Sequence, residues 1–488
     1  MTSHRRTSRP PLLVVGDALL DRDVTGTARR LCPDAPAPVL DELTETRRPG
    51  GAALAALLAA QGAGPVLLVA PFGDDPGSAA VRVLLPPTVT VLPLPLDGPM
   101  PDKTRYRAGG QTLLRADGPA GQAGPATEAV LAAITAAGTL LVSDYGRGVT
   151  ADPRIRAALA ARAAEVPLVW DPHPRGAAPV PGTRLATPNY PEALAAAGVA
   201  EAAGDPADAA LIRSAASAAG RLLERWPADG IAVTLGHRGA LLVHGGPTPL
   251  LVPARPVPGA DTCGAGDRFA AAVAVALADG ALPSEAVTQA TSAAADFLAA
   301  GGVHGLRSGS APDSDDLREG AGAALSAGDT RGGAGPGEAL ALARATRAAG
   351  GTVVAAGGCF DLLHTGHVSL LQSARSLGDC LIVCLNSDES VRRRKGDGRP
   401  VNPAADRAAV LRALDCVDAV LVFAEDTPEA ALRELRPDLW VKGGDYHGQP
   451  LPEAALLGSW GGQAITVPYQ AGRSSSRLLA MSQPAGGP

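Results

Sequence analysis

The chain alternates short apolar runs, each bounded by Gly, Pro or Asp, with longer segments in which Ala, Leu and Arg recur at helical spacing. The first series of runs reads "LLVVG", "PVLLVA", "TLLVSD", "VPLVWD" and "IAVTLG". Runs of this length alternating with helical segments are typical of βα units, which build a mostly parallel sheet with helices on its faces. The pattern therefore predicts an α/β fold.

A second series of runs follows an interruption. Residues 308–338 are rich in Gly, Ser, Asp and Pro and lack apolar periodicity, which predicts a linker. Beyond them come "TVVAAGG", "CLIVCLNSD", "DAVLVF", "DLWVKGG" and "QAITVPY". Because 488 residues exceed the size of one ordinary core, we predict a larger α/β domain over residues 1–310, a linker over 311–338 and a smaller α/β domain over 339–488.

Charge and cysteine usage narrow the class of partner. The net charge of −6 gives no overall positive field for nucleic acid or an anionic membrane. No apolar stretch approaches the roughly 20 residues of a membrane helix. The six cysteines are scattered and form no Cys-x-x-Cys pair, which is typical of reduced thiols in the cytosol. We expect a cytoplasmic protein that binds small molecules, and neither nucleic acid nor a membrane.

The stretch "PGADTCGAGDRFAAAVAVAL" carries the first candidate site. Gly264, Ala265 and Gly266 are small enough for backbone N–H groups to approach an anion at the start of a helix that we expect over 269–278. Asp267 would then lie beside that anion, where a carboxylate can accept the proton of an attacking hydroxyl during phosphoryl transfer. On these residues alone, a Gly-rich turn with an aspartate that caps the helix remains an equal alternative.

The wider context of this stretch resembles the ribokinase-like (PfkB) sugar kinases over residues 11–310. The resemblance rests on "GDALLDR", "RPGGAAL", "TPNYPE" and "TLGHRGALL", which stand in the order of that family. It implies that Asp267 is the catalytic base. It implies a sugar site that includes Asp17, Asp21, Gly50 and Gly51. It implies an ATP site that includes Asn189, Glu192, Thr234, Gly236, Gly239, Gly264, Ala265 and Gly266, with Asn189 and Glu192 organising Mg²⁺ through water.

Three further segments are similar to the kinase half of the bifunctional heptose 7-phosphate kinase/heptose 1-phosphate adenylyltransferases: "VVGDALLDRDVTGTARRLCPDAPAPVL", "DKTRYRAGGQTLLRAD" and "LLVSDYGRGV". A phosphorylated sugar needs cations, and the candidates in these segments are Arg29, Arg30, Lys103 and Arg105. Three positions depart from the family pattern. Leu54 replaces an Asn, His173 replaces a Lys, and Arg268 stands where Thr or Ser is common.

The second candidate site lies in "GGCFDLLHTGHVSLL". His364 and His367, three residues apart at the start of a helix expected at about 367–377, share one face and can reach the same phosphates. An imidazole that donates a hydrogen bond suits the charge that develops in adenylyl transfer. Zinc bound with Cys359 is the rival interpretation, although the sequence lacks a second ligand pair at matching spacing. Two further cysteines, Cys380 and Cys384, fall in a strand pattern and are predicted to be core residues.

"HTGH" resembles the His-x-Gly-His signature of the nucleotidyltransferase α/β superfamily, and the resemblance extends over about residues 350–480. "NSDESVRRRKGDGRPVNPAADR", "VKGGDY" and "GRSSSRLL" continue it, with a helix expected at about 403–414. The resemblance implies catalytic roles for His364 and His367. It implies that the nucleotide is bound by Cys359, Phe360, Asp361, Asn386, Asp388, Lys395, Arg407, Lys442, Ser474, Ser475 and Ser476. Helix capping is an additional reading of the three serines.

Together the two halves resemble the bifunctional heptose enzymes: a ribokinase-like α/β domain followed by a smaller, Rossmann-like nucleotidyltransferase α/β domain. The resemblance implies ATP as the substrate of both domains, Mg²⁺ at both sites, sugar phosphates as the other substrates, and a homodimer formed through the kinase domain. Two alternatives remain open. The kinase half could be a degenerate binding or dimerisation module beside a transferase active on another sugar or polyol phosphate, or the transferase could be a cytidylyl or flavin-nucleotide enzyme.

Overall fold

The computed structural model describes residues 10–200, 208–246, 248–259, 261–306, 336–444 and 451–468. The chain divides into two compact units, one made of Met1–Glu201, Ala215–Gly245 and Ala254–Val303, the other of Ala202–Ser214, Gly246–Pro253 and His304–Pro488. Each is a mixed α/β structure, as the two series of apolar runs predict. Within the described ranges, no helix combines the length and apolar character needed to cross a membrane.

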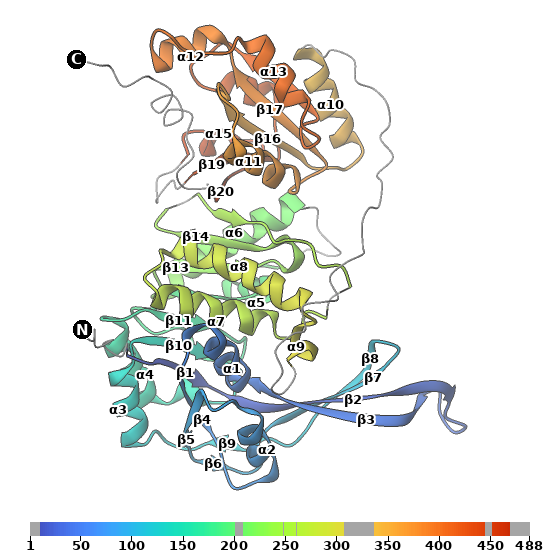
Figure 1. Ribbon diagram of the computed structural model, residues 1–488, viewed down its shortest axis with the longest axis vertical. Coiled ribbons are helices and arrows are strands. Elements are labelled where there is room, and N and C mark those ends of the chain that lie inside the picture. Colours follow the sequence, from blue (N-terminus) through green and yellow to red (C-terminus); the bar gives the residue numbers. More distant parts are fainter. Residues whose placement is uncertain are drawn as a thin grey trace, which may run out of the picture. The chain divides into compact units, whose positions relative to one another are not determined.

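The sheet of the first unit has the strand order β14-β13-β12-β11-β10-β1-β4-β5 (Figure 1). All neighbours are parallel except β13 and β14. The strands are β1 (Leu12–Gly16), β4 (Val66–Pro71), β5 (Val89–Leu94), β10 (Thr139–Ser143), β11 (Leu168–Asp171), β12 (Leu185–Ala186), β13 (Gly230–Thr234) and β14 (Ala240–His244). Five of these strands coincide with the predicted apolar runs, because a strand covered on both faces must be apolar throughout.

Helices cover both faces of this sheet. On one face α3 (Glu128–Ala136) and α4 (Pro153–Ala163) pack with Trp170 and other buried strand residues in one hydrophobic cluster. The opposite face carries α1 (Ala52–Ala63) and α7 (Ala265–Ala278), which contact each other, and α8 (Pro283–Ala299) packs on α7. The start of α7 therefore lies beside strands β10 and β11.

A four-stranded sheet projects from this body as an arm, which the apolar runs did not predict (Figure 1). Its order is β3-β2-β7-β8, and the strands are β2 (Ala18–Leu31), β3 (Pro38–Gly51), β7 (Asp102–Ala108) and β8 (Gln111–Asp117). Much of the arm is exposed, so its strands carry few apolar residues and gave no sequence signal. The base of the arm is buried and adjoins β1 and α1.

The second unit has the parallel strand order β18-β17-β16-β19-β20. The strands are β16 (Val353–Gly358), β17 (Cys380–Asn386), β18 (Ala419–Phe423), β19 (Leu439–Gly443) and β20 (Gln463–Val467). Cys380 and Cys384 are 3% and 0% exposed within its hydrophobic cluster, which confirms their prediction as core residues.

Helices of the second unit are α10 (Pro336–Ala348), α11 (Thr365–Arg375), α12 (Asp388–Lys395), α13 (Ala404–Arg412), α14 (Glu429–Leu435) and α15 (Ala454–Gly458). α11 begins and ends two residues before the predicted bounds, and α13 begins one residue later and ends two residues earlier. The remaining elements are α2 (Pro76–Leu84), β6 (Leu96–Asp97), β9 (Gln122–Ala123), η1 (Val149–Ala151), α5 (Tyr190–Ala197), α6 (Asp208–Arg225), η2 (Gly236–Arg238), β15 (Leu250–Val252) and α9 (Gly302–Gly305).

Two candidate active sites

Asp267 lies in the first turn of α7, not before the helix. The helix was predicted to begin at Phe269, but it begins at Ala265 because Gly264 adopts φ 78° and caps it in the left-handed conformation. A side chain at position 264 is excluded, since its Cβ would lie 2.7 Å from Val303 Cγ1. Ala265 N donates to Thr262 O at 3.1 Å, and no atom lies within 4 Å of the position that a Cβ on Gly266 would take. The Gly-rich turn therefore leaves open space at the helix start.

The Asp267 carboxylate is buried, with 7% of the residue exposed. Tyr145 Oη donates to it and lies 2.8 Å from Oδ1 and 3.0 Å from Oδ2. Burial raises the pKa of Asp267 to about 7, and the nearby Asp21 acts in the same direction, while the Tyr145 hydrogen bond and Lys103 oppose the rise. A carboxyl that titrates near neutral pH is suited to accept a proton from a hydroxyl.

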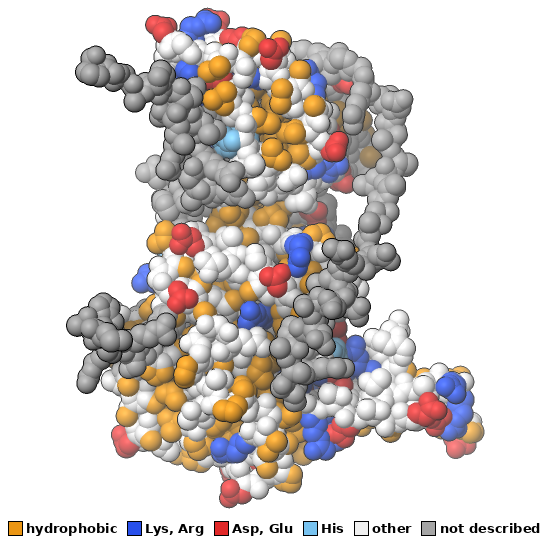
Figure 2. All heavy atoms as spheres, in the orientation of Figure 1, with side chains coloured by type: hydrophobic (Ala, Val, Ile, Leu, Met, Phe, Trp, Pro, Cys, Tyr) orange, Lys and Arg blue, Asp and Glu red, His pale blue; other side chains and the backbone are white. Residues whose placement is uncertain are grey.

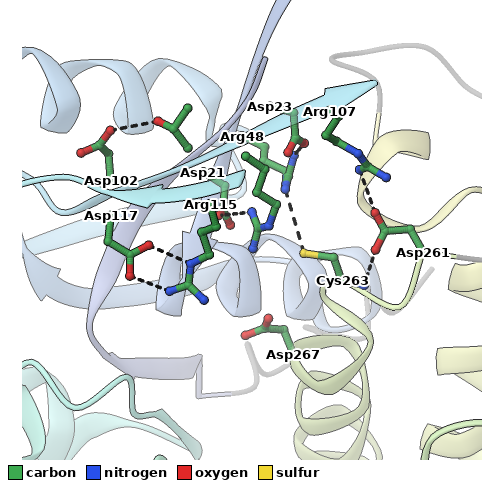
Figure 3. Close-up of polar contacts among 12 residues, drawn as sticks. Asp21, Asp23, Arg48, Asp102, Arg107, Arg115, Asp117, Asp261, Cys263 and Asp267 are labelled. Atoms are coloured by element: carbon green, nitrogen blue, oxygen red, sulfur yellow. Dashed lines mark hydrogen bonds and ion pairs between the residues drawn. The ribbon is translucent and has the colours of Figure 1, made fainter. Parts of the chain in front are cut away.

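Asp21, one of the predicted sugar residues, lies near Asp267 at the base of the arm (Figure 3), and Asp21 and Lys103 both affect the Asp267 pKa. Asp21 accepts a hydrogen bond from Arg105 Nη1 at 2.8 Å, and Lys103 Nζ lies 4.8 Å from the centre of the Tyr145 ring. Desolvation lowers the pKa of Lys103 from its usual value. The structure thus brings a carboxylate and two cations from β2 and β7 to the start of α7.

Asp17 and the Gly50–Gly51 pair shape this site. Both Asp17 carboxylate oxygens accept backbone hydrogen bonds, from Tyr145 N (3.0 Å), Arg147 N (2.9 Å) and Val149 N (3.3 Å). A Cβ on Gly50 would lie 2.5 Å from Asp21 Oδ2, and Gly51 adopts φ 58°. Asp17 therefore holds the loop that carries Tyr145. Because both of its carboxylate oxygens already accept backbone hydrogen bonds, a sugar hydroxyl would have to donate to one of the same two oxygens.

A cavity of about 160 Å³ opens beside the start of α7. Five residues predicted for the ATP site line it: Thr234, Gly236, Gly239, Ala265 and Gly266. The sequence analysis missed the rest of the lining, which includes Val257, Phe269, Ala294, Ala295, Leu298, His237 and Arg255. An apolar wall with a few polar groups suits a flat heterocycle, and the helix start at one side suits phosphate.

Asn189 and Glu192 are engaged with each other. Asn189 Oδ1 accepts from Glu192 N and Glu192 Oε2 accepts from Asn189 N, both at 2.9 Å, in a capping box at the start of α5. Burial raises the pKa of Glu192 and that of Asp171, and the negative charges of Asp267 and Glu192 raise the Asp171 pKa further. In the described ranges no three His, Cys, Asp or Glu side chains converge as a metal-ligand group.

The three departures from the kinase pattern lie in different surroundings. Leu54 is 2% exposed, and its Cδ2 would lie 3.2 Å from a Cβ on Gly264. Arg268 Nη1 donates to Leu58 O at 3.1 Å, so its guanidinium is bound to α1. His173 stacks on Tyr145 with ring centres 6.3 Å apart and therefore borders the site. Two other predicted cations, Arg29 and Arg30, sit on the exposed arm and pair with Glu42 and Asp41.

The second unit contains a cavity of about 390 Å³ at the carboxyl ends of β16 and β19. This is where the strand order reverses, the usual place of a ligand in an open parallel sheet. Five predicted residues line it: Cys359, Phe360, His367, Asn386 and Lys442. The lining that sequence analysis missed includes Arg394, Asp426, Glu429, Trp440 and Glu453.

The two histidines lie at the start of α11, where His364 is the N-cap. Their rings stack with centres 3.8 Å apart, and the His367 ring lies 5.1 Å from that of Phe360. Burial, with further contributions from His364 and Lys395, lowers the pKa of His367 to about 4. His367 is therefore neutral at pH 7, and it can donate one hydrogen bond but supplies no positive charge.

Three predicted nucleotide residues hold the chain around the cavity. Arg407, 3% exposed, donates to Asn402 O at 2.9 Å, to Cys359 O at 2.6 Å, to Asn386 O at 2.9 Å and to Asp388 Oδ1 at 2.6 Å. Asp361 accepts from Val401 N at 2.7 Å and forms an ion pair with Arg399 at 2.8 Å. The structure thus places the buried residues Arg407 and Asp361, with the partly exposed Asp388, in contacts within the chain, and their predicted contacts with phosphate remain predictions.

Lys442 and Glu453 form an ion pair of 2.7 Å in the cavity wall, next to Trp440. The second Glu453 oxygen is buried without a hydrogen-bond partner among the residues that the structure describes. The motif "VKGGDY" indicated Lys442, but the sequence analysis did not indicate its partner Glu453. Ser474, Ser475 and Ser476 lie outside the described residues.

Comparison with known proteins assigns a family to each part of the chain. Residues 10–304 match the family model described as pfkB family carbohydrate kinase, and residues 355–460 match the model described as cytidylyltransferase-like. Two solved structures cover 59% of this chain: Arabidopsis thaliana ribokinase complexed with ribose and ATP (22% identity, TM-score 0.47, 92% of that chain) and Escherichia coli phosphofructokinase-2 (18%, 0.46, 94%).

Curated relatives extend the match over both units. The chain is 57% identical to bifunctional protein HldE of Streptomyces coelicolor over 482 residues, which are 97% of each protein. It is 38% identical to bifunctional protein HldE of Azorhizobium caulinodans over 98% of this chain and 99% of the relative. The full-length match does not favour a degenerate kinase half. The chain therefore belongs to the family of the bifunctional HldE proteins, enzymes that join a carbohydrate kinase to a nucleotidyltransferase.

Proposed function

We propose that the protein makes ADP-heptose by catalysing two separate reactions. The kinase domain phosphorylates D-glycero-β-D-manno-heptose 7-phosphate at C1 with ATP. After another enzyme has removed the 7-phosphate, the transferase domain joins heptose 1-phosphate to the adenylyl group of a second ATP and releases pyrophosphate. Because a phosphatase acts between the two steps, the intermediate must leave the first site before it enters the second.

In the kinase reaction the Asp267 carboxylate accepts the proton of the C1 hydroxyl. The hydroxyl oxygen then bonds to the γ-phosphorus of ATP, and the bond from that phosphorus to the bridging oxygen breaks to leave ADP. Lys103 and Arg105 would hold the 7-phosphate; this is supported by their position on the arm strand next to Asp21. The observation that supports this mechanism is Asp267 itself: a buried carboxyl with a pKa raised to about 7, directly after Gly266, which lines the cavity beside the start of α7.

In the transferase reaction an oxygen of the sugar 1-phosphate bonds to the α-phosphorus of ATP, and the bond to pyrophosphate breaks. His367 is positioned to donate a hydrogen bond to the oxygens that gain charge in this step. Since His367 is neutral, the positive charge must come from neighbouring cations. The candidates are Lys442 and Arg394 in the cavity wall and Lys395, which is close enough to affect the pKa of His367.

Mg²⁺ is expected to accompany ATP at both sites, where it would neutralise phosphate charge. In the kinase, the negative charges of Asp267 and Glu192 raise the pKa of Asp171, so acidic groups repel one another here, and a cation would relieve that repulsion. Only Glu192 Oε2 is used by the capping box, so Oε1 can hold a water of the metal. Asn189 would act through that capping box, by fixing the Glu192 side chain.

We also propose a homodimer through the kinase arm, in the cytoplasm. Four leucines on or next to the arm strands are exposed: Leu31 (66%), Leu43 (58%), Leu113 (42%) and Leu114 (59%). Figure 2 shows hydrophobic side chains among Lys, Arg, Asp and Glu at the far end of the arm. Exposed apolar side chains on strands are typical of surfaces that a partner covers. Equilibrium sedimentation of the wild type and of Leu43→Lys tests this; a monomeric wild type would contradict it.

The experiment that tests the function uses purified protein and mass spectrometry of products. With Mg²⁺-ATP, heptose 7-phosphate should give the 1,7-bisphosphate, and heptose 1-phosphate should give ADP-heptose and pyrophosphate. Matched reactions contain hexose phosphates in place of heptose phosphates, and CTP in place of ATP. A product formed equally well from hexose 6-phosphate, or preferentially from CTP, would contradict the proposal.

A further inference from the structure

Tyr145 occupies a fixed place between the arm and α7. Its backbone N–H donates to Asp17 Oδ2 at 3.0 Å, which holds the loop after β10. Its ring is stacked by His173 on one side, with centres 6.3 Å apart, and Lys103 Nζ lies 4.8 Å from the ring centre. The side chain therefore has little conformational freedom, and its hydroxyl is held next to the Asp267 carboxylate.

That hydroxyl lies within hydrogen-bond distance of both Asp267 oxygens, 2.8 Å from Oδ1 and 3.0 Å from Oδ2. Burial and the Asp267 charge raise the pKa of Tyr145 well above its usual value, so the phenol stays protonated and acts as a donor. A phenol carries one proton, which it can give to one carboxylate oxygen at a time. The other oxygen is then available to an incoming hydroxyl.

The charges that face Asp267 come from three strands. Asp21 on β2 and Asp171 at the end of β11 are acidic, and burial raises the pKa of Asp171 well above its usual value, while Lys103 on β7 is basic. Burial and Asp21 favour a protonated Asp267, whereas the Tyr145 hydrogen bond and Lys103 favour the carboxylate. Tyr145 is the neutral member of this group that touches the carboxylate directly.

We propose that Tyr145 is the positioning residue of the kinase reaction: its hydroxyl stabilises the Asp267 carboxylate and directs one of its oxygens toward the sugar hydroxyl. The proposal rests on the proposed role of Asp267 as the base. Tyr145 itself transfers no proton in this step. The hydroxyl proton of the sugar passes to Asp267, and the phenol keeps its own.

A first test requires no substrate and therefore does not depend on the proposed function. The carboxyl ¹³C signal of Asp267 is followed against pH in full-length protein labelled at aspartate and identified by its loss in Asp267→Asn. Removing a hydrogen bond to a charged group should raise the titration midpoint in Tyr145→Phe by about one to two pH units. Tyr106→Phe, on β7, is the matched control and should leave the midpoint unchanged. Equal midpoints in Tyr145→Phe and the wild type would overturn the proposal.

A second test separates positioning from packing. Relative to the wild type, kcat/KM of the kinase reaction in Tyr145→Phe should fall roughly fivefold to fiftyfold at pH 7 and recover most of the loss at pH 9 or above, because kcat/KM reports the ionisation of the free enzyme. Transferase activity of the same preparation shows that the protein is folded. A loss of equal size at every pH would mean that Tyr145 only packs. A wild type without kinase activity would refute the proposed function, while the carboxyl titration would still decide whether Tyr145 sets the Asp267 ionisation.

Discussion

The two sites handle the same nucleotide, but burial has opposite consequences for their central side chains. In the kinase, burial raises the pKa of Asp267 to about 7, so the carboxyl titrates near neutral pH, as its proposed role as base requires. In the transferase, burial lowers the pKa of His367 to about 4, so the imidazole loses the charge that it would carry in acid. Desolvation disfavours the charged form in both cases, and only the sign of the charge differs.

The difference teaches how each site obtains the charge that it needs. A proton acceptor improves when its pKa rises toward the working pH, so burial alone improves Asp267. A site that must stabilise phosphate charge cannot use a buried neutral histidine for that purpose, and it needs cations with a high pKa. Lys442 and Arg394 line the transferase cavity, whereas Lys103, whose pKa is lowered by desolvation, is the cation beside Tyr145 in the kinase.

The largest expected effect is the loss of one activity without the other. Asp267→Asn keeps the size of the side chain but removes the base, so kinase kcat should fall by about 10²- to 10⁴-fold. Adenylyl transfer by the same protein should be unchanged. Initial rates of both reactions on one preparation measure this. A kinase that retains most of its rate would show that another group accepts the proton.

His367→Gln is the matching change in the second site. Glutamine retains a hydrogen-bond donor, so the transferase should lose less rate than in His367→Ala, for which we expect about a 10²- to 10³-fold fall in kcat. Kinase activity serves as the internal control. If the glutamine and alanine variants lose equal rate, donation of a hydrogen bond is not what His367 contributes.

The pH profiles should differ between the two reactions of the wild type. Kinase kcat/KM should rise about tenfold per pH unit below pH 7 and level off above it, because the active Asp267 is ionised. His367 should not affect the transferase between pH 6 and 8, since its pKa is about 4. Profiles that rise together would contradict the assignment of opposite pKa shifts.

Substitutions of Asp267 and His367 should change the free energy of unfolding in different pH ranges. Asp267 titrates near pH 7 when folded and near 3.8 otherwise, so its contribution is lost as the pH rises from about 4 to 7. Asp267→Asn should therefore stabilise the kinase unit at pH 8, by at most about 4 kcal/mol, and have little effect near pH 4.

His367, with a lowered pKa, costs stability as the pH falls from 6.5 toward 4, so His367→Gln should stabilise the transferase unit in acid only. Calorimetry at pH 5 and pH 8 measures both.

The smallest expected effect concerns Arg268. Its guanidinium donates to Leu58 O on α1, so Arg268→Thr should change kinase kcat by less than about twofold and reduce stability by about 1 kcal/mol. His173→Lys restores the lysine of the family pattern at a position that borders Tyr145, and its kinase rate should be measured beside that of Arg268→Thr. A large kinase gain in Arg268→Thr would show that the arginine impairs the reaction and would revive the idea of a weakened kinase half.

Local pattern was enough to predict some of these features and not others. The buried strands were predicted because full burial forces an apolar run, and the turn at Gly264 because small residues let backbone N–H groups approach an anion; the structure adds that Gly264 adopts φ 78°. The arm was missed because its exposed strands have no apolar requirement. Arg407 and Asp361 were predicted to meet the nucleotide, and the structure shows them bonding to the chain, because the number of nearby acceptors is not visible in the sequence.

The sequence by itself determined the family and the order of the two domains, and it predicted Asp267, His364 and His367 as the reactive side chains, since these depend on residue type and spacing. Only the tertiary structure decided the state of those side chains. Burial, Tyr145 and Asp21 affect the pKa of Asp267, and burial and Lys395 affect that of His367. Tyr145 and Asp21 lie far from Asp267 in the sequence, and Lys395 lies far from His367. Desolvation and Coulomb interactions depend on distance in space, so the chain must fold before either site acquires its chemistry.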